Sequence, residues 1–518
     1  MAFGWIVKAS LLGLAVACGT HSAAATTKSD DMISRVLRDL RDAVSLQLQL
    51  TVKRDAMEIN AQHRMDAIAQ IVTDSEDPTK HALSGFAVIH GSDSTAIWQM
   101  NNNVPTISTQ ATGAERSESQ CVPIEALPPF QQLFDAIATS APESSSTISC
   151  AGGHTYAMEF AGEPYVLCVV DTAGISIVSS DIELQVAFSS DALLPLPSET
   201  TESRCERLPA LTIPDSANPT KVLPARRNLR EAACSCRGRR RPCVFFHGMD
   251  VAQDRGLQDD SPFFGDIKNH APCCSSVKFA FLNTVDFGWN DAHLQKRTCE
   301  LALQAAGHGS NAPNRTISDT IVVAHSMGNL MLASAIANGH CQMDASSDWV
   351  ALSAPMKGSM GADLQRKICD GGDVGKDIVK AVSQLFGQCP ASVARRSLVY
   401  QGETYCSPAL DQAYSAAQAV YRQHVSAAVC SESFMGLLSK DQLPLMLGGA
   451  IIPHKSKQND GVVEFQSCLG GLASEPFHDH FTSRFYRAKL NHIDTRFAHG
   501  DALFNSAQKP VKWFECLL

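Results

Sequence analysis

The stretch that decides the fold of the second half of the chain is Val322–Leu330, VVAHSMGNL. A short apolar run leads into His-Ser-Met-Gly, and a second apolar run continues up to Asn338. This order predicts a buried strand, a tight turn with Ser326 at its apex, and a buried helix. A serine hydroxyl is a poor nucleophile unless it is exposed, oriented and paired with a base. A sharp turn supplies that exposure, so Ser326 is the candidate nucleophile.

Three further motifs surround this turn in the chain. Upstream, CVFFHGMD predicts a short buried strand that ends in His247 and Gly248, and the following loop offers a backbone N–H to a developing oxyanion. Downstream, KQNDGVV places Asp460 on a turn beside an apolar run, and His492 lies near the C-terminus. A serine, a carboxylate and a histidine in this order are the three groups that nucleophilic ester chemistry needs.

With these motifs, residues 242–518 resemble a serine α/β-hydrolase of the lipase or esterase kind. A fourth motif, Ser353–Ser359 (SAPMKGS), is similar to a loop of lipases and of GPI inositol-deacylase-like proteins. Ala324 stands where the family has its first elbow glycine, and a methyl group is tolerated there. The resemblance implies a mostly parallel sheet and a cap insertion at about 360–445.

The resemblance also implies a role for each motif residue. Ser326 would attack the acyl carbon, His492 would take its proton, and Asp460 would orient the imidazole. The backbone N–H groups of Met249 and Met327 would hold the oxyanion.

Other residues near the motifs are expected either to line the pocket or to serve as alternatives for the catalytic base and acid. His247, Gly248 and His325 are expected to line the pocket, because His325 is too close to Ser326 on the turn to act as its base. Alternatives for the base are His478, His480 and His499, and Asp494 is the alternative acid.

Two classes of function remain open. The first is a hydrolase of acyl esters, most simply lipid esters, with an acyltransferase as its variant. The second is an inactive binding protein that keeps the same framework. No cofactor or metal is expected, because Cys234, Cys236, Cys273 and Cys274 lack the spacing of a zinc site. A net charge of −10 argues against nucleic-acid binding. Peripheral membrane contact stays possible, and no transmembrane segment is expected after residue 25.

The chain begins with the pattern of a secretory signal at 1–25, with a bacterial lipobox ending at Cys18 as the alternative. The expected location is therefore extracellular. The chain has 18 cysteines, and losing Cys18 with the signal leaves an odd number, so disulfides and at least one free thiol are expected. The sequon at Asn314 predicts a glycan upstream of the Ser326 strand.

The domain organisation follows from changes in pattern. Residues 26–192 predict an α+β domain, with a helical region at 30–72 followed by antiparallel strands. Residues 193–241 carry repeated prolines and predict a linker. From 242 onward, apolar strands alternate with helices, which predicts a parallel sheet covered on both faces.

Overall fold

The structure, a computed structural model, describes residues 32–518 apart from short gaps (59–61, 91–93, 112–117, 125–126, 144–149, 151–152, 171–173, 190–204, 219–233, 308–312, 438 and 440). The predicted signal at 1–25 and Cys18 lie outside the described residues. The chain divides into two compact units, Met1–Ala233 and Cys234–Leu518.

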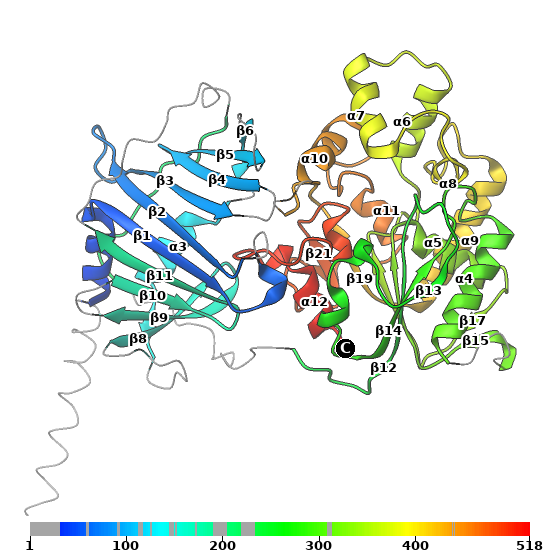
Figure 1. The fold of residues 1–518 in the computed structure, drawn as a ribbon, viewed down its shortest axis with the longest axis horizontal. Coiled ribbons are helices and arrows are strands. Elements are labelled where there is room, and N and C mark those ends of the chain that lie inside the picture. The colour runs from blue at the N-terminus through cyan, green and yellow to red at the C-terminus, as the bar shows by residue number, and fades with distance from the viewer. Residues whose placement is uncertain are drawn as a thin grey trace, which may run out of the picture. The chain divides into compact units, whose positions relative to one another are not determined.

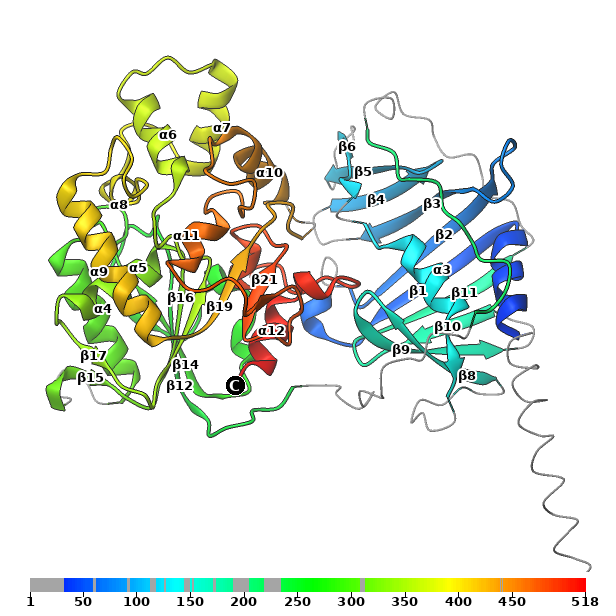
Figure 2. The same ribbon diagram turned by 180° about the vertical axis from the view of Figure 1, so that it is seen from behind.

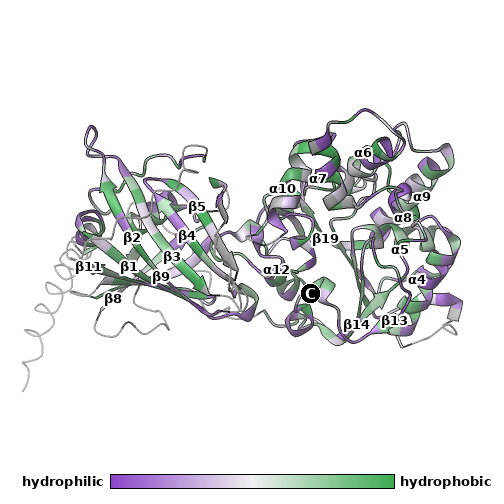
Figure 3. Cartoon of the chain, turned by 45° about the horizontal axis from the view of Figure 1, so that its top comes forward, coloured by the Kyte–Doolittle hydropathy of each residue, from purple (hydrophilic) through white to green (hydrophobic). Residues whose placement is uncertain are grey.

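The first unit is built on an eleven-stranded antiparallel sheet (Figure 1), in the order β6-β5-β4-β3-β2-β1-β11-β10-β9-β8-β7. Hydrophilic and hydrophobic residues alternate along several of its strands (Figure 3). The helix α3 (Phe130–Ala138) lies on one face of this sheet (Figure 2). The strands are β1 Ser45–Val52, β2 Arg64–Thr73, β3 His81–His90, β4 Ser94–Asn101, β5 Val104–Ala111, β6 Glu118–Cys121, β7 Ala141–Pro142, β8 His154–Phe160, β9 Glu163–Val170, β10 Gly174–Val178 and β11 Ile182–Ser189, with a short η1 at Asp55–Met57.

The long helix predicted at 30–72 is wrong. The described helix covers only 32–42, and β1 and β2 follow it. The sequence of β1, SLQLQLTV, alternates apolar and polar residues, which is the period of a half-buried strand. The helical spacing of Leu40, Val44 and Leu48 hid this alternation, because both periods share some positions.

The second unit contains a mixed eight-stranded sheet in the order β13-β14-β12-β16-β18-β19-β21-β20. Strand β13 pairs with β14 antiparallel, and the other neighbours pair parallel. The strands are β12 Arg241–Phe246, β13 Gly256–Gln258, β14 Cys274–Phe281, β16 Ile321–His325, β18 Asp348–Leu352, β19 Val425–Ser431, β20 Phe477–His478 and β21 Phe485–Ala488. A separate small sheet pairs β15 Thr316–Ile317 with β17 Gln342–Met343.

Helices flank this mixed sheet, and large apolar side chains fill most of the core beneath them around β12, β16 and β18. The helices are α4 Ala292–Ala305, α5 Met327–Ala337, α6 Met360–Cys369, α7 Lys376–Phe386, α8 Val393–Ser397, α9 Pro408–His424, α10 Gln442–Ile451, α11 Phe465–Leu469 and α12 Pro510–Cys516. Short 3-10 turns are η4 Pro262–Phe264, η5 Ile267–His270, η7 Pro313–Arg315, η8 Asp494–Arg496 and η9 Ser506–Gln508.

The predicted fold class is therefore corrected. We expected a mostly parallel α/β-hydrolase sheet with a cap insertion, preceded by an α+β domain. The structure instead has a large antiparallel sheet that dominates the N-terminal region and a mixed sheet in the second unit. The sequence pattern missed the size of the first sheet because its alternating strands at 45–73 were assigned to a helix.

The predicted cap at 360–445 is also not one insertion. It contains β19, which pairs with β18 and β21 inside the sheet. The sequence of β19, VSAAVCS, is rich in small residues with little strand propensity, so it carried no clear signal.

The predicted linker at 193–241 is divided between the two units. Cys205 forms a disulfide with Cys121, and Leu211 bridges to His81, so part of the linker belongs to the first unit. The second unit begins at Cys234 and not at 242.

Eight disulfides are formed among the described residues, and Cys406 is the free cysteine there. The pairs are Cys121–Cys205, Cys150–Cys168, Cys234–Cys516, Cys236–Cys273, Cys243–Cys274, Cys299–Cys341, Cys369–Cys389 and Cys430–Cys468. This confirms the prediction of disulfides, which fit an oxidising compartment. Within the described ranges, no helix has the length and apolar character needed to cross a bilayer.

Candidate active site

Ser326 lies where β16 ends and α5 begins, in the middle of the mixed sheet. Its backbone has φ 53° and ψ −129°, a conformation that residues other than glycine rarely adopt. Two glycines make room for this turn. A Cβ on Gly248 would lie 2.9 Å from the Ser326 Cβ, and a Cβ on Gly328 would lie 2.7 Å from the carbonyl oxygen of His247. The tight turn therefore depends on the absence of side chains at both positions.

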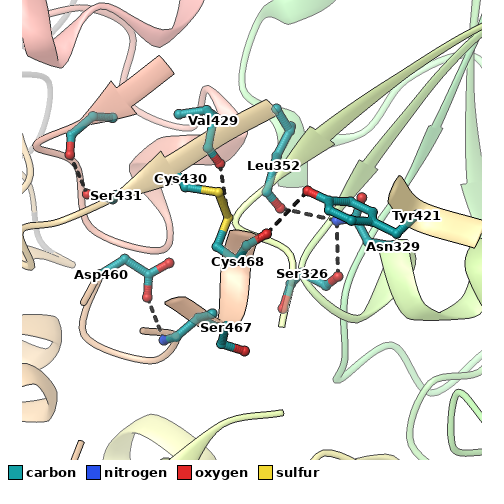
Figure 4. Close-up of a disulfide and its surroundings, with 12 residues drawn as sticks. Ser326, Asn329, Leu352, Tyr421, Val429, Cys430, Ser431, Asp460, Ser467 and Cys468 are labelled. Carbon is teal, nitrogen blue, oxygen red and sulfur yellow. Dashed lines mark hydrogen bonds between the residues drawn. A yellow bond between two sulfur atoms is a disulfide. The ribbon is translucent and has the colours of Figure 1, made fainter. Parts of the chain in front are cut away.

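Asn329, one turn into α5, ties this turn to the strands beside it (Figure 4). Its amide nitrogen donates to the carbonyl oxygens of Ala324, Ser326 and Leu352, at 2.8, 3.2 and 3.3 Å. Its amide oxygen accepts from the indole nitrogen of Trp349. The side chain is fully buried, so these bonds hold the strained turn from beneath.

The structure brings Ser326, His492 and Asp460 into one hydrogen-bonded chain. The Nε2 atom of His492 is 3.0 Å from the Ser326 Oγ, and its Nδ1 atom is 2.8 Å from an Asp460 carboxylate oxygen. All three residues are more than nine-tenths buried. An ionised Asp460 accepts from Nδ1–H, which leaves Nε2 free to accept the hydroxyl proton of Ser326.

Asp460 is held as a carboxylate by its surroundings. Burial raises the pKa of this carboxyl, but the charge and hydrogen bond of His492 and the N–H groups of Val462 and Val463 outweigh it, so the pKa lies below its usual value. The acid loop also lies within the segment closed by the Cys430–Cys468 disulfide, which Figure 4 shows in the same close-up as Asp460. The disulfide therefore limits the motion of the segment that carries Asp460.

The oxyanion side of the site is shaped by His247. Its Nδ1 atom lies 2.7 Å from the carbonyl oxygen of Gly248, and its Nε2 atom accepts from the backbone N–H of Leu282. Burial lowers the pKa of His247 to about 4, so the ring is neutral and Nδ1–H donates. Because C=O and N–H point oppositely in a trans peptide, holding the Gly248 carbonyl also fixes the direction of the Met249 N–H.

Met249 and Met327 were the predicted oxyanion donors. Neither N–H has a hydrogen-bond acceptor among the described residues. The Met327 N–H belongs to the first turn of α5, where helix N–H groups have no partner within the helix. Neither N–H group is therefore used by the described part of the protein.

A small pocket lies beside Ser326, with a cavity volume of about 10 Å³, which is room for about one water molecule. Most of its walls are apolar side chains, and the polar ones come from Ser326, Ser359 and Arg395. It is lined by Met249, Ser326, Pro355, Ser359, Ala362, Arg395, Leu398, Val462 and Val463. His247, Gly248 and His325, which we predicted as lining residues, are not part of this lining and lie beneath or beside it.

The alternative residues are engaged elsewhere. His499 bonds to Asp494 at 2.6 Å and lies 3.2 Å from Asp441, so Asp494 and His499 form a separate pair. His478 is exposed, and His480 bonds to Thr482. No contact with Ser326 is described for any of them.

Sequence reasoning did not identify Asn329, Ser359 or Arg395. Asn329 belonged to the quoted motif, and a polar amide in an otherwise apolar helical run is a signal that could have been used. Arg395 lies 69 positions beyond Ser326 on a five-residue helix, and no local pattern marks it. The predicted sequon residue Asn314 is exposed before β16 begins, away from the strand end that carries Ser326.

Comparisons with known proteins add little to this geometry. No family model and no curated protein matches the chain. Among solved structures, the crystal structure of LprF from Mycobacterium bovis aligns with 33% of this chain and 98% of its own length, at 13% identity and a TM-score of 0.24. A TM-score this low carries no argument about the fold or the function.

Proposed function

We propose that the protein is a serine hydrolase that cleaves acyl esters through Ser326, His492 and Asp460. The observation that carries the proposal is the buried chain of hydrogen bonds from Asp460 to His492 to Ser326, beside a pocket that contains the Ser326 hydroxyl. A surface serine has no need of a buried carboxylate and an imidazole in line with its hydroxyl.

The reaction proceeds in two steps. The Ser326 Oγ attacks the acyl carbon while its proton passes to His492 Nε2, and that proton then goes to the departing alcohol oxygen. Water next attacks the acyl-enzyme, gives a proton to the same Nε2 atom, and releases the acid as Ser326 recovers its proton. The N–H groups of Met249 and Met327 stabilise the oxyanion in both steps, and one such donor contributes roughly 3 kcal/mol.

The finer parts of the proposal are a lipid substrate and an extracellular location. The apolar walls favour an acyl chain, and the disulfides fit an oxidising compartment. The free volume holds about one water molecule, so a long chain requires the walls to move apart. Rates on p-nitrophenyl esters from acetate to laurate test this, and a steady fall with chain length leaves a hydrolase of short acyl esters.

Labelling with a fluorophosphonate probe tests the hydrolase itself. We expect the probe to attach to Ser326, as located by mass spectrometry, and to be lost in Ser326→Ala. Ser359→Ala is the matched control, since this second pocket serine already donates to the Val462 carbonyl. Labelling elsewhere, or ester turnover that survives in Ser326→Ala, would overturn Ser326 as the nucleophile. A wild-type protein that is neither labelled nor active on esters argues for the alternative of an inactive binding protein. An acyltransferase is distinguished by product analysis with added alcohol.

A further inference from the structure

Arg395 brings a positive charge to the wall of the Ser326 pocket. The other lining residues are apolar or hydroxyl-bearing, and the side chain of Arg395 is only 15% exposed. A guanidinium in such surroundings attracts an anion more strongly than one in water, because the apolar walls screen the charge poorly. The positive charge of Arg395 therefore suits a ligand that carries a negative charge.

The guanidinium is only partly satisfied by the protein. One terminal nitrogen pairs with Asp250 at 2.8 Å, and Asp250 is 41% exposed. The Nε atom is buried without an acceptor among the described residues. Since a guanidinium has five N–H donors in a planar fork, most of its donors have no acceptor among the described residues.

The position of Arg395 is fixed by its helix, α8. The carbonyl oxygen of Ser397 at the end of this helix accepts from the indole of Trp289 and from the hydroxyl of Tyr414, both fully buried. The backbone of Gly387 lies against the guanidinium, where an added Cβ would be 2.5 Å from a terminal nitrogen. A charged group held this firmly beside the nucleophile is suited to selecting substrates.

We infer that the Ser326 site prefers acyl esters that carry a negatively charged group, a phosphate or a carboxylate, and that Arg395 selects them. This inference rests on the proposed function and narrows its substrate class. Both anions present paired oxygens that match the guanidinium fork. The competing structural role is that the Arg395–Asp250 ion pair only braces the loop that carries Met249.

Two matched ester pairs test the inference on the full chain. The first is monobutyrylglycerol and its phosphate monoester, and the second is p-nitrophenyl butyrate and p-nitrophenyl hemisuccinate. In the wild-type protein, we expect kcat/KM for at least one anionic ester to exceed that of its neutral match by about tenfold. The pair that shows the preference identifies the anion as phosphate or carboxylate. Equal rates within both pairs would overturn the inference.

Variants distinguish selection of anionic substrates by Arg395 from a purely structural role of the Arg395–Asp250 ion pair. Arg395→Gln should abolish the preference ratio, and Arg395→Lys should keep part of it because the charge remains. Asp250→Asn should raise the ratio, since it removes a competing carboxylate. Arg396→Gln, its exposed neighbour on the same helix, should behave like the wild type. If Arg395→Gln and Asp250→Asn both lower kcat/KM equally for neutral and anionic esters, the ion pair only braces the loop that carries Met249. That result would overturn the inference that Arg395 selects anionic substrates.

Failure of the proposed function gives a different result. In that case neither the neutral nor the anionic esters are hydrolysed and the fluorophosphonate does not attach to Ser326, so the inference falls with it. Thermal unfolding of each variant shows that a changed ratio comes from folded protein.

Discussion

The imidazole of His325 donates its Nε2 hydrogen to the carbonyl oxygen of His492, at 2.9 Å. The residue before the proposed nucleophile thus supports the backbone of the proposed base, and the two rings lie 4.8 Å apart. Burial, His492 and Arg496 hold the pKa of His325 well below its usual value, so the ring stays neutral at physiological pH. His325 therefore acts as a positioning residue.

His325→Leu should lower kcat by about tenfold or more, because the carbonyl of His492 loses a buried donor and the imidazole of the base loses its support. KM should change little, since His325 does not line the pocket. His325→Gln, whose amide can still donate, should recover part of the rate. Steady-state kinetics on p-nitrophenyl butyrate measure both. Equal rates for the leucine and glutamine variants would argue against a role for this hydrogen bond.

Asp460→Asn should reduce kcat by about 10⁴ while the protein stays folded. The asparagine oxygen can still accept from the N–H groups of Val462 and Val463, but its NH2 group faces His492 and favours a proton on Nε2. That tautomer cannot accept the Ser326 proton. Kinetics together with circular dichroism test this, and a loss below tenfold would contradict Asp460 as the acid.

The lowered pKa of Asp460 also predicts that the folded protein loses stability in acid. Because the folded-state pKa of Asp460 lies below its unfolded value, its contribution is present above about pH 4 and is lost as the pH falls through the folded pKa. The stability gap between wild type and Asp460→Asn should therefore shrink in acid. Urea unfolding at several pH values measures it, and a constant gap would contradict the assignment.

Gly248→Ala should lower the rate by about tenfold or more, because the new methyl would lie 2.9 Å from the Ser326 Cβ and 3.3 Å from its Oγ. Gly238→Ala is the matched control, since nothing lies within 4 Å of an added Cβ there. Fluorophosphonate labelling rates compare the two. Similar labelling of both variants would show that the turn can widen without penalty.

Asp363 on α6 predicts a stability change near neutral pH. Burial raises its pKa to about 6, above its unfolded value of about 4. The folded state therefore binds the proton more tightly, so the contribution is full below about pH 4 and is lost as the pH rises through 6. The stability of Asp363→Asn relative to wild type should rise by about 2 kcal/mol from pH 4 to pH 8. Chemical unfolding measures this, and a difference that does not depend on pH would refute it.

Removing the Cys430–Cys468 disulfide as a double alanine variant should lower stability by about 4 kcal/mol, from the lost closure of the loop between them. Activity should fall as well, because Asp460 lies inside that loop. Replacing Cys150 and Cys168, a disulfide of the first unit, is the control and should leave ester turnover intact. If the double variant at 430 and 468 keeps full activity, the disulfide is not needed to position Asp460.

The local sequence determined the parts of the site that depend on short-range patterns. A strand, a turn and a helix around Ser326 follow from a few consecutive residues, and the structure has them as β16 and α5. Ser326 directly follows β16 and His492 lies four residues after β21, whereas Asp460 lies in a loop after α10, so its place beside His492 depends on the tertiary fold. The long helix at 30–72 failed because helical and strand periods overlapped there.

Only the tertiary structure decided which side chains face the nucleophile and which lie beneath it. His247 and His325 sit next to the motif glycine and serine, yet their rings turn inward to backbone carbonyls. Arg395 comes from a distant helix and lines the pocket. Likewise, β19 joins the sheet despite its weak strand propensity, since pairing with β18 and β21 decides it. Contacts between segments that are far apart in the chain produce no local pattern in a single sequence, so only the folded structure shows them.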